Sequence, residues 1–291
     1  ARVTLNRPER GNSITLDMPG ELAASVERAN LDPRVHVIAL SGNGKGFCGG
    51  YDLVLSAEQR VGGSLEPGDL REGSFMDPAV QRANHDPGQP WDPMIDYAMM
   101  SRNVRAFMSL FYSDKPVVCK VHGFCVAGGT DMALCSDLLI IEDKAKIGYP
   151  PARVWGAPTT AMWVFRIGLE KTRRLLFTGD SLSGTEAVEW GLASEAASRD
   201  RLDERFESIL ERIARLPVNQ LMMMKLLVNQ TVMNQGLQTT QLLGALFDGM
   251  ARHTKEGYGF QQRASEAGFK RAVEERDSPF GDFGPRFQSS E

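Results

Sequence analysis

Two glycine-rich turns hold the residue types from which this sequence could build a reactive site. The first runs from Ser41 to Leu53 and directly follows a predicted strand. Glycines permit positive φ and close approach of a ligand, so the N–H groups of such a turn can point into a cleft. The same composition also suits a tight connection from a strand to a helix. Taken alone, the turn leaves these two interpretations equally open.

The first turn does not match the common phosphate-binding patterns. Lys45 lacks the four-residue spacer and the following Ser or Thr of a P-loop. The spacing Gly42-x-Gly44-x-Gly46 also differs from the dinucleotide fingerprint G-x-G-x-x-G. The hypothesis of a dinucleotide-dependent oxidoreductase therefore rests on this one glycine-rich turn, and absence of NAD(P)H binding would exclude it.

The second turn runs from His122 to Leu134, and a helix is predicted to begin at its glycines, Gly128 and Gly129. The first turn of a helix offers free N–H donors and a partial positive charge. Such an end is suited to stabilising a developing oxyanion. The alternative is a helix that packs closely on the sheet, with Asp131 stabilising its first turn. That alternative explains Asp131 but not the presence of two glycine turns.

The elements that must position these turns are predicted to be strands and helices in alternation. Residues 2–6 open the chain as a strand, and short β-rich runs predict further strands at 35–40, 116–121 and 138–141. Helical patterns occur at 22–29, 99–111 and 130–135. This alternation favours an α/β fold with a sheet covered by helices.

The chain changes character after about residue 160, where strand signals vanish and helical patterns follow one another. Ser183 and Glu186 have the spacing of a capping box, which predicts a helix that stops at Gly191. Further helices are predicted at 202–216, 221–232 and 237–253. The stretch 57–96 is rich in Pro and Gly without sustained periodicity, so we expect a long loop there.

Composition narrows the classes of function. The chain has 291 residues, of which 42% are hydrophobic and 24% charged, and its formal net charge of -4 gives no basic field for nucleic acid or an anionic membrane. No apolar run approaches the roughly 20 residues of a membrane span. The cysteines match no zinc spacing, so we expect no metal site. We expect their thiols to be buried and the protein to be located in the reducing cytoplasm. The chain lacks an initiator Met, and we expect a few residues to precede it.

Several motifs in one order resemble the crotonase (enoyl-CoA hydratase/isomerase) superfamily. They are Asn6-Arg7-Pro8, Phe47 to Leu53, Gly123 to Asp137, Leu176 to Asp180 and Ala187 to Leu192. The resemblance covers nearly the whole chain except the Pro-rich stretch. It implies a spiral of ββα turns over residues 1–195, with an insertion at about 57–96. A helical region at 196–291 would then pack in a homotrimer, or in a hexamer made of two trimers.

The resemblance also implies roles for individual residues. The N–H groups of Tyr51 and Gly128 would form an oxyanion hole, and Asp131 would be the first acid. Hydratases of the family carry Glu at that position, whereas dienoyl-CoA isomerases carry Asp. No cofactor would be bound permanently, since CoA arrives as part of the substrate. The residues implied in substrate or CoA binding are Arg10, Ser13, Gly49, Gly50, Asp52, Leu53, Ala127 and Pro151, and Lys270 and Arg271 could approach the CoA phosphates.

The second acid position departs from the family pattern. The pattern Gly-x-Pro-Glu aligns with residues 148–151, so Pro151 stands where a glutamate is expected. Tyr149 or Arg153 could supply a donor instead, or the chain could run enolate chemistry with one acid. A replacement could also come from the long loop, where the candidates are Asp77, His85, Asp86, Asp92 and Asp96.

The sequence therefore predicts an enzyme that acts on an acyl-CoA thioester through an enolate-like intermediate. Hydration of an enoyl-CoA is the default activity of the family, and isomerisation is its nearest variant. Pro151 motivates two alternatives: a CoA-thioester binding protein with little or no catalysis, and a hydrolase or lyase of the same superfamily.

Overall fold

The computed structural model describes residues 1–52 and 68–281. Leu53 and the first part of the predicted loop therefore lie outside the described residues. Within them, the main sheet is parallel throughout and has the strand order β1-β2-β3-β5-β8. Its strands are β1 (Arg2–Leu5), β2 (Ile38–Gly42), β3 (Val117–Val121), β5 (Leu138–Glu142) and β8 (Glu195–Ala197).

Alternate side chains of this sheet enter two separate cores, as expected for strands whose side chains alternate between faces. Ile38 and Leu40 join the large core, whereas Val37 and Ala39 face α8 (Leu202–Ala214) on the other side. Both faces are thus buried, which explains the continuous apolar runs of these strands.

A second sheet connects the two glycine turns. It has the order β4-β6-β7, with β4 (Phe124–Val126) parallel to β6 (Lys146–Gly148) and β6 antiparallel to β7 (Ser181–Ser183). An isolated parallel bridge joins Cys48 of the first turn to Cys125 in β4. The first turn is therefore attached to the strand that leads into the second.

The helices surround the sheets on several sides. The crossover helices are α1 (Met18–Leu31), α3 (Pro78–Asn84), α4 (Pro93–Tyr112), α5 (Gly128–Ala133), α6 (Met162–Thr178) and α7 (Gly184–Glu189). After α8 come α9 (Val218–Asn234), α10 (Leu237–Arg252), α11 (Lys255–Ala267) and α12 (Phe269–Asp277). Short 3-10 turns occupy η1 (Pro8–Arg10), η3 (Pro150–Arg153) and η4 (Ser278–Phe280).

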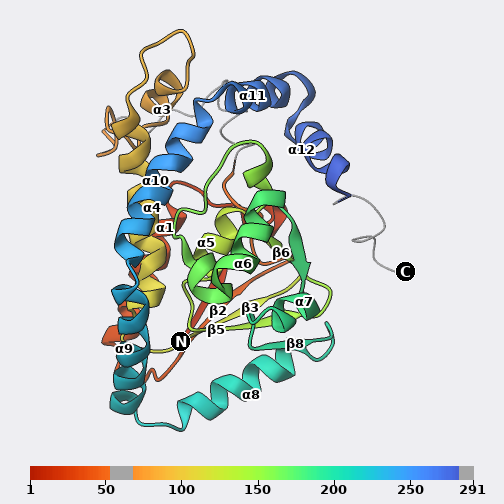
Figure 1. Ribbon diagram of the computed structural model, residues 1–291. Coiled ribbons are helices and arrows are strands. Elements are labelled where there is room, and N and C mark those ends of the chain that lie inside the picture. Colours follow the sequence, from red (N-terminus) through yellow and green to blue (C-terminus); the bar gives the residue numbers. More distant parts are fainter. Residues whose placement is uncertain (53–67, 282–291) are drawn as a thin grey trace.

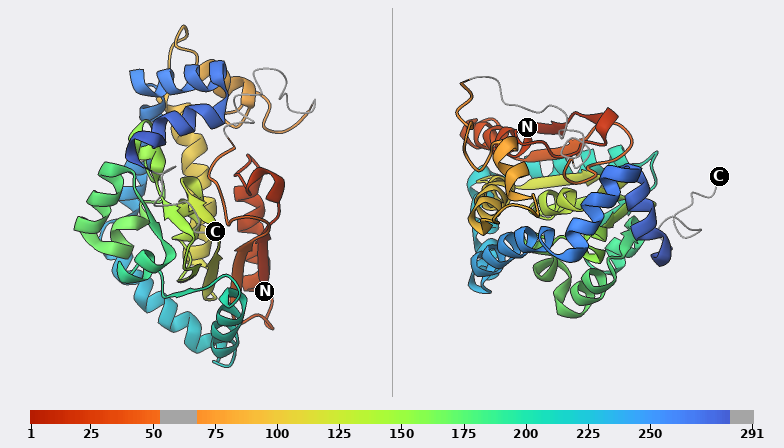
Figure 2. Two further views of the ribbon diagram at one scale, coloured as in Figure 1. Left: turned by 90° about the vertical axis from the view of Figure 1, so that its right-hand side faces the viewer. Right: turned by 90° about the horizontal axis from the view of Figure 1, so that it is seen from above.

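One helix pair closes the side of the molecule next to the glycine turns. Helix α10, blue in Figure 1, runs along α4, which is yellow, and the two are in direct contact. Figure 2 shows α1 and the first strands on one side of the molecule and α6 on the opposite side. Residues 237–252, late in the chain, thus lie beside residues 93–112.

The structure confirms the predicted α/β class and corrects two local predictions. Strands do not vanish after residue 160, because β7 and β8 follow; each has three residues, too few to produce a recognisable alternation. The stretch up to residue 96 is not all loop. Helix α3 lies within it and α4 begins at Pro93, each with an aspartate N-cap and a proline in its first turn. Those prolines start helices here.

The predicted capping box is present, since Ser183 and Glu186 each accept from the other's backbone N–H. No helix of the described residues is long and apolar enough to cross a membrane.

Candidate active site

The first glycine turn presents the Tyr51 N–H on the side away from its neighbouring segment. The Ile14 N–H donates to the Gly50 oxygen at 2.8 Å, and the Asp52 N–H donates to the Ile14 oxygen at 3.1 Å. These two bonds form a parallel bridge between Ile14 and Tyr51, in which the N–H of Tyr51, between the two bonded groups, points away from Ile14. Within the described chain it donates to no other group.

The second turn directs the Gly128 N–H in a similar manner. Ala127 has φ 53° and ψ -130°, a backbone conformation that a residue with a Cβ rarely adopts. Its oxygen accepts from both the N–H and the hydroxyl of Thr130, at 2.9 and 2.7 Å, which holds the turn in place. Helix α5 begins at Gly128, whose N–H therefore has no acceptor inside the helix.

The two turns are in contact with each other. A Cβ built on Gly50 would lie 2.8 Å from the Ala127 Cβ and 3.5 Å from the Gly128 nitrogen. One built on Gly129 would lie 2.6 Å from the Cys48 oxygen. The glycines therefore permit an approach of two backbone segments that no larger residue would allow. The residues predicted to supply the two donors are brought together from distant parts of the chain.

The Tyr51 side chain also belongs to this region, which sequence reasoning did not anticipate. Its ring lies over Gly128, where an added Cβ would meet the ring at 2.7 Å. Its hydroxyl is buried next to Asn103 without a well-aligned hydrogen bond to any described residue. Burial and the charges of Asp131 and Asp248 raise the pKa of Tyr51, so the phenol stays protonated.

Asp131 lies in the first turn of α5 and is buried, with 1% of its surface exposed. Its Oδ1 accepts from the Thr160 N–H at 3.1 Å and from the Thr160 hydroxyl at 3.0 Å. Its Oδ2 is buried and accepts no hydrogen bond from the described residues. Burial raises the pKa of Asp131 to about 7, and Thr160 only partly offsets this effect. At neutral pH the carboxyl can both take up and release a proton.

A second buried carboxylate, Asp248, was missed by sequence reasoning. It lies on α10, and its charge also raises the pKa of Asp131. Its Oδ1 accepts from the Ala157 N–H at 3.3 Å, and its Oδ2 accepts from Arg252 at 2.6 Å. The sequence does hold an Asp and an Arg four residues apart on α10, the spacing of a helical ion pair, but nothing local shows that this pair is buried.

This arrangement coincides with a match to a known protein family. The family model described as enoyl-CoA hydratase/isomerase matches residues 1–66 and 92–282. The chain belongs to this family. The fold agrees: a crystal structure of an enoyl-CoA hydratase from Mycobacterium smegmatis has a TM-score of 0.91 and 52% identity, covering 99% of this chain and 94% of that one.

Two curated relatives of this chain have names that imply different reactions. The 1,2-epoxyphenylacetyl-CoA isomerase of Escherichia coli is 27% identical over 241 residues, which are 80% of this chain and 79% of the relative. The (E)-benzylidenesuccinyl-CoA hydratase of Thauera aromatica is 28% identical over 218 residues, which are 74% and 72%. The relatives thus carry names of both isomerases and hydratases.

Pro151, which the resemblance aligns with a second acid, lies in η3 and is partly buried against Gly156. The two neighbours considered as substitutes are already engaged. The Tyr149 hydroxyl donates to the Ala157 oxygen at 2.8 Å. Arg153 donates to Asp277 at 3.0 Å and lies over the ring of Phe280 at 4.1 Å.

The loop residues considered as a replacement acid have structural partners. Asp77 and Asp92 cap α3 and α4. Asp86 accepts from the Gly88 N–H at 2.8 Å. Asp96 and His85 meet in a separate cluster with His253.

The segments expected to bind CoA lie along one path. Arg10 is exposed, and its oxygen accepts from the Ser13 hydroxyl at 2.6 Å. The exposed Gly49 lies beside Ser13. Asp52 is different, because it is buried and paired with Arg7 at 3.0 Å, which indicates a role in fixing the turn. On α12, Arg271 pairs with Glu275 at 2.9 Å.

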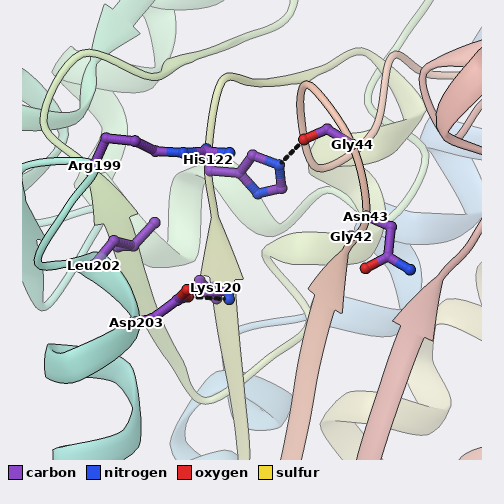
Figure 3. A pocket seen from close by; sticks show the side chains of 8 residues that line it. All are labelled: Gly42, Asn43, Gly44, Lys120, His122, Arg199, Leu202 and Asp203. Atoms are coloured by element: carbon purple, nitrogen blue, oxygen red, sulfur yellow. Dashed lines mark hydrogen bonds and ion pairs between the residues drawn. The ribbon is translucent and has the colours of Figure 1, made fainter.

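A pocket of about 210 Å³ lies elsewhere, at the carboxyl ends of β2 and β3 (Figure 3). None of the predicted site residues lines it. Its charged groups are satisfied within the protein: Lys120 pairs with Asp203, Arg199 with Glu142, and His122 bonds the Gly44 oxygen. His122 therefore has a structural role, because it holds the first glycine turn through the Gly44 oxygen.

Proposed function

We propose that this chain catalyses proton transfer at carbon atoms next to the thioester of an enoyl-CoA substrate. The Tyr51 and Gly128 N–H groups would bind the thioester oxygen and stabilise the negative charge that develops on it. Asp131 would act as the base that removes a proton and as the acid that returns it. CoA would enter as part of the substrate, with no permanently bound cofactor.

The observation that carries this proposal is the state of Asp131. Its carboxyl is buried in the helix turn that begins at Gly128, it keeps one oxygen without a hydrogen bond, and its pKa is raised to about 7. A buried carboxyl with such a pKa is typical of a general acid/base. A purely helix-stabilising aspartate would instead be exposed and ionised.

The reaction we favour is a shift of the double bond. A base removes a proton from one carbon of the acyl chain, the double bond migrates through the enolate, and the same group returns a proton to another carbon. This sequence needs one acid/base, consumes no water and leaves the substrate's atoms unchanged in number. Pro151 at the second acid position favours it over a reaction that needs two cooperating carboxylates.

Hydration is the second candidate. The names of the Mycobacterium smegmatis structure and of the Thauera aromatica relative favour it. Adding water requires a group that handles the water proton as well as Asp131. The Tyr51 hydroxyl and Asp248 are the polar groups of the described chain that raise this option, since both interact electrostatically with Asp131.

The test is Asp131→Asn, with Asp200→Asn at an exposed position as its control. Both variants would be assayed for double-bond migration and for hydration with a panel of enoyl-CoA thioesters. We expect Asp131→Asn to lower kcat by about 10²–10⁴-fold, and the control to match the parent. Undiminished turnover would remove Asp131 from the mechanism. Binding by calorimetry without turnover of any substrate by the parent would favour the alternative of a CoA-thioester binder.

We also propose that the chain assembles as a homotrimer or as two stacked trimers. One side of α9 and α10 exposes large apolar side chains that a single chain leaves uncovered: Met223, Met224, Leu226, Leu227, Val228, Leu242, Leu243, Phe247 and Met250. Contiguous apolar surface of this kind is typical of a protein interface.

The buried free thiols of Cys48, Cys119, Cys125 and Cys135 support a reducing, cytoplasmic location.

A further inference from the structure

Two histidines and an aspartate converge beside α10, in a cluster that the proposed reaction does not use. His85 follows α3, Asp96 lies on α4 and His253 follows α10. One potential ligand atom from each lies within 4.8 Å of the other two. Asp96 is buried, with 1% of its surface exposed.

Two atoms of this cluster are buried without a proper hydrogen bond. The His85 Nε2 lies 3.2 Å from the Asp96 Oδ1, but the alignment is too poor for a hydrogen bond, and neither atom finds another partner among the described residues. Buried polar atoms are nearly always satisfied, so an unsatisfied pair that faces each other needs an explanation. An ion held between them would provide it.

The neighbouring residues hold the three side chains in position. Trp91 and Asn84 donate to the Asp96 Oδ2 at 2.8 and 3.0 Å, which leaves Oδ1 as the available oxygen. The Tyr258 hydroxyl contacts the His253 Nδ1 at 2.8 Å, so that Nε2 faces Asp96 at 2.9 Å. Outer partners of this kind orient the ligands in metal sites.

The electrostatics of the cluster are compatible with a cation. Arg252 lies next to His253 in the chain, but its guanidinium pairs with Asp248 at 2.6 Å. The charge of Arg252 also acts on Asp96, but within the described residues Arg252 forms its ion pair with Asp248 and not with that carboxylate. A metal ion would bind the neutral form of both imidazoles.

We propose that His85, Asp96 and His253 together bind a divalent transition-metal ion such as zinc. Two imidazole nitrogens and one carboxylate oxygen are a common zinc ligand set with bonds of about 2.0–2.2 Å. Ligand atoms that share such an ion lie roughly 3 Å apart. The two histidines approach the Asp96 carboxylate at about that separation but at different oxygens, His253 Nε2 at 2.9 Å from Oδ2 and His85 Nε2 at 3.2 Å from Oδ1. Three protein ligands leave a fourth position for water.

This site is separate from the pattern that defines the family. The family match omits residues 67–91, the segment that contributes His85, Asn84 and Trp91. A bound ion would join α3 and α4 to the end of α10, the helix that also carries Asp248. Its role would be to fix that helix, and its occupancy can be tested without any assay of turnover.

The experiment is a titration of the chelator-treated full chain with Zn²⁺ by calorimetry, and with Co²⁺ by visible absorption. We expect one ion per chain and a melting temperature that rises by several degrees with Zn²⁺, since only the folded chain offers the site. His85→Ala should weaken Zn²⁺ binding at least 100-fold. His36→Ala should bind like the parent, because His36 lies between α1 and β2, where its Nδ1 is bonded to the Leu216 oxygen, and it is not part of the cluster.

His253→Gln provides a second variant, with far-UV circular dichroism to check that each variant is folded. Failure of the parent to bind either ion would overturn the proposal. Equal Zn²⁺ affinity in the parent and in folded His85→Ala would also overturn it, because the ion would then be held elsewhere.

Discussion

Gly50 and Ala127 are in contact across the two turns, and both have positive φ, 94° and 53° respectively. Each immediately precedes one of the two N–H groups proposed to bind the thioester oxygen. The left-handed conformation at each position turns the following N–H out of its own segment. At residue 50 only a glycine fits, because an added Cβ would meet the Ala127 methyl at 2.8 Å.

The first prediction concerns this contact. Gly50→Ala would combine an unfavourable φ with a clash and would displace the Tyr51 N–H or the Gly128 N–H. Losing one donor of an oxyanion hole costs about 10²–10³-fold in kcat, and steady-state kinetics with an enoyl-CoA would measure it. The matched control is Gly20→Ala in α1, where an added Cβ meets nothing within 4 Å. A Gly50→Ala variant that folds and keeps full kcat would contradict the proposed donors.

The second prediction is a pH dependence of turnover. Burial raises the pKa of Asp131 to about 7, and the base form is required to remove a proton. kcat/KM should therefore rise through a single ionisation near pH 7 and level off above it. A flat profile from pH 5 to 9 would argue against Asp131 as the base.

The same shift predicts a pH dependence of stability. The pKa of Asp131 is higher in the folded chain than the ordinary 3.8 of an unfolded one. Its contribution to stability is therefore complete below about pH 4, declines as pH rises and is lost above about pH 7. At about 1.4 kcal/mol per pKa unit, the decline is on the order of 4 kcal/mol. Urea unfolding of the parent and of Asp131→Asn from pH 4 to 8 should show this decline in the parent alone.

The fourth prediction separates the two groups of Tyr51. Tyr51→Phe removes the buried hydroxyl but keeps the backbone N–H. If double-bond migration by Asp131 is the reaction, kcat for that reaction should change less than about tenfold, since general acid/base catalysis supplies 10²–10⁴-fold and Asp131 would remain. A loss of hydration activity alone would assign the phenol to the handling of water.

The fifth prediction concerns assembly. Leu226 and Leu227 are 68% and 67% exposed on α9. Replacing both by Glu should lower the oligomeric mass measured by light scattering after gel filtration, because charges at the centre of an apolar interface oppose association. Leu31→Glu is the control, since Leu31 is 74% exposed on α1. A monomeric parent, or an unchanged mass in the double variant, would reject this interface.

The parts of the fold that sequence reasoning identified are those with strong local signals. Strands 117–121 and 138–142 are rich in Val, Ile and Leu, and the helix after Ser183 begins with a capping box. Strands β7 and β8, of three residues each, were missed because they are stabilised by pairing with β6 and β5, which leaves no local pattern in the sequence. Tertiary context overrides propensity at such positions.

The residues of the candidate site likewise include some that the sequence predicted and some that it did not. The glycine turns are visible in the sequence because backbone geometry restricts the residue type at each position. Asp248 was not visible, since nothing local distinguishes a carboxylate that faces Asp131 from one that faces water. The position of the Tyr51 ring over Gly128 was also hidden, because it depends on how two distant turns meet.

Helix α10 cannot slide along its axis without disturbing several contacts at once. An added Cβ on Gly244 would lie 3.0 Å from the Pro158 and Thr159 oxygens, and one on Gly249 would lie 2.8 Å from the Asp96 Cβ. These two close contacts fix the position of α10 along its axis, against the loop before α6 and against α4. The position of Asp248, one residue before Gly249, therefore depends on the absence of a side chain at these two glycines. Replacing either glycine by a larger residue would move Asp248 and so change the pKa of Asp131 on α5, although neither glycine contacts that carboxyl.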